Sequence, residues 1–309
     1  NMEWWSGQLG NLLLKRGEPD EAIASFRKTV ELGPWASNYS RLADALRKKG
    51  QVDEAIVCYR KAAELAAKLE PKLDYWCGLG VSLRFKGELD EAITCLRKSV
   101  EIRPDYGPSW QELSIALYLR NKHGDAEESV SCARKSVALE PKVAEARRTL
   151  AAALSVDGKR DEAIACYREA LALDPKDGIA YHNLGVLLYQ SDRLDEALSC
   201  HRRAVEFKPE IAEFHHDLAT LLDQLGQRDA AIESFRNAVK LDPTMPPRVA
   251  PAAMNPKRRL PCSASKTSTI RAQKTDTTNR LKTEVQIKNA RPTQTCCSGV
   301  ATYRSAAKR

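Results

Sequence analysis

The sequence predicts an all-α fold, in which helix–turn–helix units stack into a solenoid and a basic tail follows. A short acidic motif, Asp-Glu-Ala-Ile or a close relative, recurs at steps of 33, 37, 37, 34, 34 and 34 residues. Such a fixed period is the signature of a repeat architecture. Ala and Leu supply much of the apolar content and aromatic residues are only 6% of the chain, which favours helices. The motif begins at Asp20, Asp53, Asp90, Glu127, Asp161, Asp195 and Asp229.

Each unit opens with a predicted helix that carries two leucines four residues apart. This spacing places both leucines on one face of a helix. A small residue follows the first leucine in every unit, which lets a neighbouring helix approach closely. The pairs are Leu9/Leu13, Leu42/Leu46, Leu79/Leu83, Leu113/Leu117, Leu150/Leu154, Leu184/Leu188 and Leu218/Leu222.

A glycine is expected to end the first helix, because glycine accepts the left-handed conformation that such a stop requires. The sixth unit has Asp192 at this place, and aspartate tolerates that conformation better than most residues. The glycines are Gly17, Gly50, Gly87, Gly124, Gly158 and Gly226.

The acidic motif then opens the second helix, where its charge faces the positive end of the helix dipole. An inward aliphatic residue follows, with a larger residue three places on in most units. A proline closes most units, since proline cannot continue a helix. The aliphatic residues are Ile23, Ile56, Ile93, Val130, Ile164, Leu198 and Ile232.

This pattern resembles the tetratricopeptide repeat, a 34-residue helix–turn–helix unit. The best matches are Trp76-Cys-Gly-Leu79-Gly80-Val-Ser-Leu83 and Tyr181-His-Asn-Leu184-Gly185. The resemblance implies a right-handed superhelical solenoid whose first helices line a concave face that binds peptides. Seven repeats are expected between residues 3 and 243, at about 3–36, 36–72, 73–106, 107–143, 144–177, 178–211 and 212–245.

Two units depart from the period. The second has four extra residues at Ala66–Leu69, and the fourth has about three at Asn121–His123. Both insertions are expected in loops, where they alter local geometry without breaking the stack.

If the first helices line the groove, its binding residues can be read from the sequence. In the first three units the side chains are basic, whereas in the last two they are mixed to acidic. This asymmetry suggests an extended protein or peptide partner with acidic residues at one end. For each single residue, an ordinary solvated position is the competing interpretation. The residues are Lys15, Arg41, Arg47, Lys48 and Arg84, then His182, Asn183, Glu213, His216, Asp217 and Asp223.

The sequence suggests no catalytic machinery, cofactor or metal site, so we do not expect an enzyme. Cysteines recur once per unit at Cys58, Cys95, Cys132, Cys166 and Cys200, which is what a small packing position in a reduced protein looks like. His182 and His216 hold equivalent places in adjacent units, but a metal needs three ligands and a second shell. Histidines of the groove or the surface are the preferred interpretation.

The composition changes after Pro243. Residues 244–309 hold 14 Lys/Arg and 2 Asp/Glu, a balance of +12, whereas residues 1–243 hold 35 basic and 39 acidic residues. Few apolar residues are present to offset the entropy of ordering, so residues 244–309 are predicted to be disordered. This tail could bind nucleic acid non-specifically. We expect no nucleic-acid binding elsewhere.

The leading hypothesis is therefore a protein-interaction scaffold. The alternative is a substrate-recruiting fragment of a larger enzyme, such as an O-linked glycosyltransferase or a kinase-associated protein. No apolar run is long enough for a membrane span, and we expect a cytoplasmic protein, with the nucleus as the alternative. Because no polar capping helix follows the seventh unit, its face around Leu225, Phe235 and Val239 is expected to be exposed and open to self-association.

Overall fold

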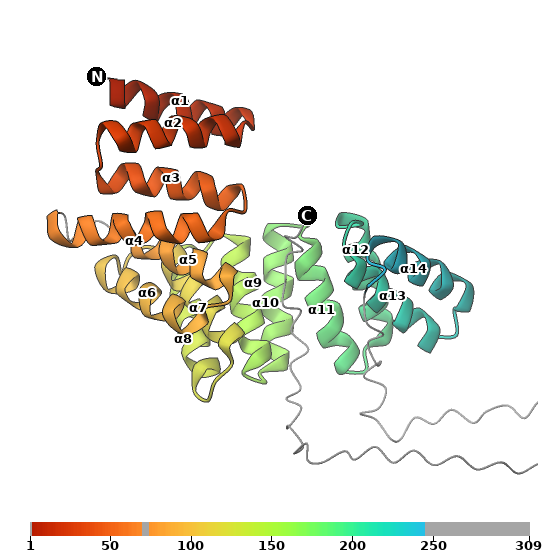
Figure 1. The fold of residues 1–309 in the computed structure, drawn as a ribbon. Coiled ribbons are helices and arrows are strands. Elements are labelled where there is room, and N and C mark those ends of the chain that lie inside the picture. The colour runs from red at the N-terminus through yellow and green to blue at the C-terminus, as the bar shows by residue number, and fades with distance from the viewer. Residues whose placement is uncertain (1, 70–73, 245–309) are drawn as a thin grey trace, which may run out of the picture. The chain divides into compact units, whose positions relative to one another are not determined.

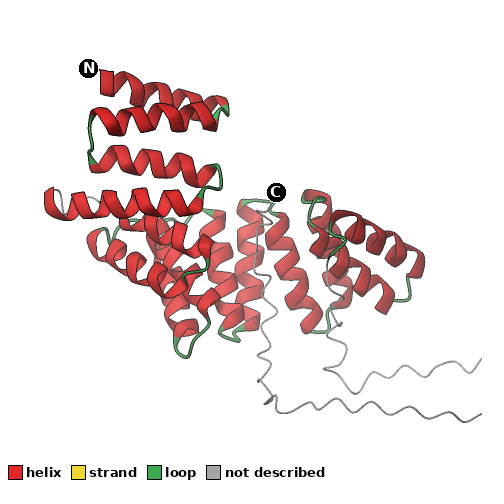
Figure 2. Ribbon diagram, viewed as in Figure 1, coloured by secondary structure: helices red, strands yellow, loops and turns green. Residues whose placement is uncertain are grey.

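The computed structural model describes residues 2–69 and 74–244, and within them all regular structure is helical (Figures 1 and 2). From residue 245 on, the predicted tail lies outside the described residues. The helices are α1 (Met2–Arg16), α2 (Pro19–Leu32), α3 (Ala36–Lys48), α4 (Val52–Leu69), α5 (Trp76–Lys86), α6 (Leu89–Ile102), α7 (Gly107–Arg120), α8 (Asp125–Leu139), α9 (Ala144–Val156), α10 (Arg160–Leu173), α11 (Gly178–Gln190), α12 (Leu194–Phe207), α13 (Ala212–Gln224) and α14 (Arg228–Leu241).

The described helices pack as successive hairpins, as the repeat period predicts. The two helices of each unit, from α1 with α2 to α13 with α14, pack against each other. The second helix of each unit then packs against the first helix of the next, as α2 does on α3 and α6 on α7. First helices of successive units also touch directly, from α3 on α5 to α9 on α11. Each unit thus buries its apolar face against its neighbours, which is how a solenoid gains stability.

The small residue after the first leucine lets the two helices of one unit come together. A Cβ atom added to Gly80 would lie 2.6 Å from the Leu96 side chain, and one on Gly10 would lie 2.7 Å from Phe26. At Gly185 the neighbour is His201, at 3.0 Å. The close approach predicted at this position is confirmed, and the approaching group is the large residue of the unit's own second helix.

The turns follow the prediction in every unit but the fourth. The predicted glycines all have positive φ, and Asp192 takes the same conformation at φ 63°. In the fourth unit, however, the residue that caps the end of α7 is Asn121, which adopts φ 49°, and Gly124 instead precedes the first residue of α8. The expectation that Gly124 ends the first helix is therefore wrong. Because of the insertion at Asn121–His123, one left-handed residue, Asn121, ends α7 and a second, Gly124, precedes α8.

The prediction for the insertion in the second unit is also wrong. We expected the extra residues Ala66–Leu69 in a loop, but they prolong α4, which runs for 18 residues. Ala and Lys dominate this stretch and favour helix over loop. The second helix of the second unit therefore extends by about one turn.

The first and last units leave predicted core positions exposed. Leu9 is 53% exposed and Ile232 is 48% exposed, although both were expected to face inward. Their counterparts in the interior units lie between helices of adjoining units, whereas α1 packs mainly on α2 and α14 on α13, each within its own unit. Of the face predicted to be exposed in the last unit, Phe235 and Val239 are exposed. Leu225 is half-buried and packs against the core, so the prediction is wrong for this residue.

Candidate interaction surfaces

The outer side of the second helices carries a repeated ladder of ion pairs. An arginine directly follows the large-residue position of every second helix, and in the first five units it pairs with the glutamate of the next unit's acidic motif. Between their closest atoms, the five pairs span 2.7–3.1 Å. The pairs are Arg27–Glu54, Arg60–Glu91, Arg97–Glu128, Arg134–Glu162 and Arg168–Glu196.

The ladder changes at the last unit, where the motif has Ala230 in place of glutamate. Arg202 there donates a hydrogen bond to the Gln227 side chain at 3.4 Å. The paired side chains along the ladder are about half exposed. Each exposed pair contributes little to stability. The main effect of the ladder is therefore that the charges of the arginines and glutamates on this surface balance.

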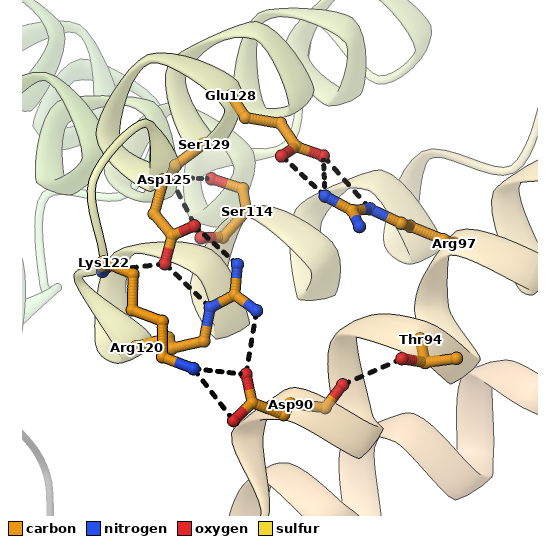
Figure 3. A network of polar contacts seen from close by, with 9 residues as sticks. All are labelled: Asp90, Thr94, Arg97, Ser114, Arg120, Lys122, Asp125, Glu128 and Ser129. Carbon is orange, nitrogen blue, oxygen red and sulfur yellow. Dashed lines mark hydrogen bonds and ion pairs between the residues drawn. The ribbon is translucent and has the colours of Figure 1, made fainter.

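A denser network joins the third unit to the fourth (Figure 3). Arg120 at the end of α7 donates to Asp125 Oδ1 at 2.6 Å and to Asp90 Oδ1 on α6 at 2.9 Å. Asp125 also accepts the backbone N–H of Lys122 at 2.8 Å, so its carboxylate closes the inserted loop. The hydrogen bond to Arg120 lowers the pKa of Asp125 below its ordinary value against the effect of burial. Arg120 therefore fixes both the inserted loop and the junction between units.

The first helices present a different kind of surface. The residue directly before the first leucine changes from unit to unit and includes cationic, anionic, polar and small side chains. Equivalent positions of one repeat therefore carry different chemistry, whereas the second helices repeat one pair. Of these positions, only the one in the fifth unit is buried. The residues are Gln8, Arg41, Gly78, Glu112, Thr149, Asn183 and Asp217.

Two of the predicted groove cations are held by neighbouring acids. Arg84 on α5 pairs with Glu112 on α7 at 2.9 Å, with both side chains largely covered. Arg47 pairs with Asp44 at 3.3 Å, and Asp44 also accepts a hydrogen bond from the hydroxyl of Tyr59 at 2.5 Å. The charges at Arg47 and Arg84 are thus largely balanced within the chain. Lys15, Arg41 and Lys48 are exposed.

His182 was predicted to be a groove or surface residue, but it is buried. The residue is only 1% exposed, and its ring stacks on Phe214, with ring centroids 4.4 Å apart. His182 therefore does not belong to a solvated groove or surface. Asn183, Glu213, His216 and Asp217 are half-buried, and Asp223 is exposed.

Two predicted histidines of the last two units lie beside the carboxylate of Asp217. Asp217 Oδ2 lies 3.7 Å from His182 Nε2, and Asp217 Oδ1 lies 3.2 Å from His216 Nδ1. Burial raises the pKa of Asp217. The hydrogen bond with His216 and the nearby rings of His182 and His201 lower that pKa by more than burial raises it, so it falls below the ordinary value. Burial lowers the pKa of His201. The cluster thus favours an ionised Asp217.

The cysteine column lies at packing positions on the second helices. Cys95 and Cys132 are buried, and Cys58, Cys166 and Cys200 are half-buried. Burial raises the pKa of Cys95 to about 11 and that of Cys132 to about 12. These thiols stay protonated near neutral pH, which matches the predicted packing role and disfavours reactivity.

Sequence reasoning missed two features. The arginine of the ladder recurs in all seven units, and a comparison of the aligned units would have revealed it. The approach of Glu213 to His182 had a weaker signal, because it depends on how α11 and α13 are offset. The spacing of Glu213 and Asp217, four residues apart on one helix, did place both carboxylates on one face.

Comparisons with known proteins identify the family. The family model of the cilia and flagella-associated protein 70 C-terminal domain matches residues 4–216. A family model of the tetratricopeptide repeat matches residues 212–245. The chain belongs to the family of the cilia and flagella-associated protein 70 C-terminal domain, and it is built of tetratricopeptide repeats. A search of the curated proteins found no match.

Solved structures agree on the fold. The Cut9–Hcn1 hetero-tetramer of the APC/C is 17% identical, with a TM-score of 0.64 over 75% of this chain and 45% of that chain. A tetratricopeptide repeat protein from Parabacteroides merdae is 14% identical, with a TM-score of 0.62 over 78% of this chain and 93% of that chain. The protein TTC0263 from Thermus thermophilus is 24% identical, with a TM-score of 0.51 over 60% and 98%. At these identities the likeness concerns the fold alone.

Within residues 2–69 and 74–244, no helix combines the length and the apolar character that crossing a bilayer requires.

Proposed function

We propose that the chain is a protein-interaction scaffold that binds an extended segment of a partner along the face of its first helices. The fold supports a scaffold role, because stacked repeats offer a long continuous surface for recognition. The observation that carries the choice of face is the contrast between the two helical surfaces. The first helices vary their chemistry at equivalent positions, whereas the second helices repeat one neutralised ion pair.

The proposed partner segment is acidic where it meets the first two units. Lys15, Arg41 and Lys48 are exposed there. They are selected from the predicted groove cations because the other two, Arg47 and Arg84, form ion pairs with acids of the chain. Toward the other end, the face carries Asn183, Glu213, Asp217 and Asp223. Complementary charge at both ends would fix the direction in which the segment lies.

The test compares two charge reversals in the full chain. One variant carries Arg41→Glu and Lys48→Glu on first helices, and its control carries Arg60→Glu and Arg97→Glu on the ladder. Proteins captured from cells by each variant are quantified against the unaltered chain. We expect the first-helix variant to lose the main partners by at least about tenfold, while the ladder variant keeps them. Equal capture by both variants would overturn the choice of face.

The family name suggests where to look for partners. We infer that the chain works in cilia or flagella, because its family is named for a protein associated with them. Expression of a fluorescent fusion in ciliated cells tests this setting. Enrichment along the cilium supports it, and a uniform distribution in the cell body contradicts it.

A further inference from the structure

Three side chains that can bind metal converge between the sixth and seventh units. His182 comes from α11, while Glu213 and Asp217 lie four residues apart on α13. The ligand atoms of these three residues all lie within 4.8 Å of one another. Two helices therefore supply one imidazole and two carboxylates to a single point.

The separations suit ligands that share an ion. His182 Nε2 and Asp217 Oδ2 are 3.7 Å apart, which is longer than a direct hydrogen bond. Two ligands bound at about 2.0–2.1 Å to a tetrahedral ion lie about 3.4 Å from each other. Small side-chain adjustments would bring all three ligand atoms to that spacing.

The surroundings hold the ligands in place. His182 is buried and stacked on Phe214, so its ring has little freedom to turn away. His216 Nδ1 lies 3.2 Å from the other carboxylate oxygen of Asp217. A histidine on the outer oxygen of a ligating carboxylate is the kind of second shell that orients metal ligands.

We propose that His182, Glu213 and Asp217 bind a divalent transition-metal ion such as Zn²⁺. An imidazole ligand favours such ions over Mg²⁺ and Ca²⁺, which prefer oxygen ligands throughout. Three protein ligands leave a coordination position for water, and the ion joins α11 to α13. Its role is to lock the last two units together, independently of any bound partner.

The test measures Zn²⁺ binding to the full chain by isothermal titration calorimetry, with Co²⁺ absorption as a second readout. Glu213→Gln and Asp217→Asn remove one ligand each with little change of shape, and His182→Phe keeps a ring against Phe214. We expect each change to weaken binding at this site at least about tenfold. The rise in melting temperature on adding Zn²⁺ should fall in parallel.

Two control variants leave the cluster intact. Asp223→Asn removes an exposed carboxylate from the same helix, and His123→Asn removes an exposed histidine from the inserted loop. Zn²⁺ held elsewhere, including by cysteines, would be common to all variants and cancel. The proposal fails if Glu213→Gln, Asp217→Asn and His182→Phe bind Zn²⁺ as the unaltered chain does, or if Asp223→Asn weakens binding as much as Asp217→Asn.

Discussion

Two arginine–carboxylate pairs at the third and fourth units differ in burial and in what they connect: Arg97–Glu128 joins the two units, whereas Arg120–Asp125 lies within the fourth. Arg97 and Glu128 lie on the ladder with side chains 50% and 39% exposed, whereas Asp125 is 5% exposed beside Arg120. The first pair is one copy of a motif that five successive junctions repeat. The second is specific to the fourth unit and closes its inserted loop. The ladder gives successive units the same outer surface. The buried contacts of a unit, such as that of Asp125, supply stability and differ from one unit to the next.

The largest effect is expected from removing the buried carboxylate. Asp125→Ala leaves Arg120 with its exposed partner alone and releases the Lys122 backbone N–H, so the free energy of unfolding should fall by about 3 kcal/mol. Urea denaturation followed by circular dichroism measures the change. Asp90→Ala is the control, because Asp90 contacts the same arginine from an exposed position. Equal losses in the two variants would remove the distinction between the pairs.

The next effect concerns the close approach of helices inside a unit. Gly80→Ala should destabilise the protein by about 2 kcal/mol, because the new Cβ would lie 2.6 Å from Leu96 and 3.2 Å from the carbonyl oxygen of Ala92. Gly7→Ala is a matched change in α1, where the nearest atom is the flexible end of Arg41 at 3.2 Å. Helix propensity should make that variant neutral or more stable. A stabilised Gly80→Ala variant would contradict the packing described here.

Sequence reasoning predicted the repeated interior well, because leucine spacing, small residues and turn glycines obey local rules in every unit. It failed where a rule depends on a neighbour. Leu9 and Ile232 carry the core pattern but lie on α1 and α14, which pack mainly on the other helix of their own unit. Gly124 keeps its left-handed conformation, while Asn121 ends the first helix in its place. For the groove, sequence located the polar positions of the first helices. It did not foresee that Glu112 balances Arg84 or that Phe214 covers His182, since both contacts cross between units.

A smaller effect should follow from the buried thiol of Cys132. Its folded pKa of about 12 lies above the ordinary value of 9.0. The thiol stays protonated in the folded state while the unfolded chain ionises, so stability is lost as pH rises above about 9. At about pH 10 the unaltered chain should lose about 1 kcal/mol more than Cys132→Ala, relative to neutral pH. Denaturation at both pH values measures this difference.

The half-buried Cys166 provides the control for the alkaline effect. Its pKa is also raised by burial, but its side chain is less covered than that of Cys132. Cys166→Ala should therefore change the pH dependence less. A larger change for Cys166→Ala than for Cys132→Ala would contradict the burial order of the cysteine column.

The smallest effect is expected on the ladder. Arg97→Ala should lower the free energy of unfolding by about 0.5 kcal/mol or less, because both partners are well exposed and screened. Raising the salt concentration should reduce even this difference. A loss comparable to that of Asp125→Ala would mean that the ladder holds the units together.

The central claim is that partners bind to the first helices and not to the ladder. Site-specific photocrosslinking in cells tests it directly, with a photoreactive residue placed at Lys48 or Asp223 on first helices and at Arg97 or Arg168 on second helices. We expect partner proteins to crosslink from Lys48 and Asp223 and at most weakly from the two arginine positions. Strong crosslinks from Arg97 and Arg168, with none from Lys48 and Asp223, would contradict it.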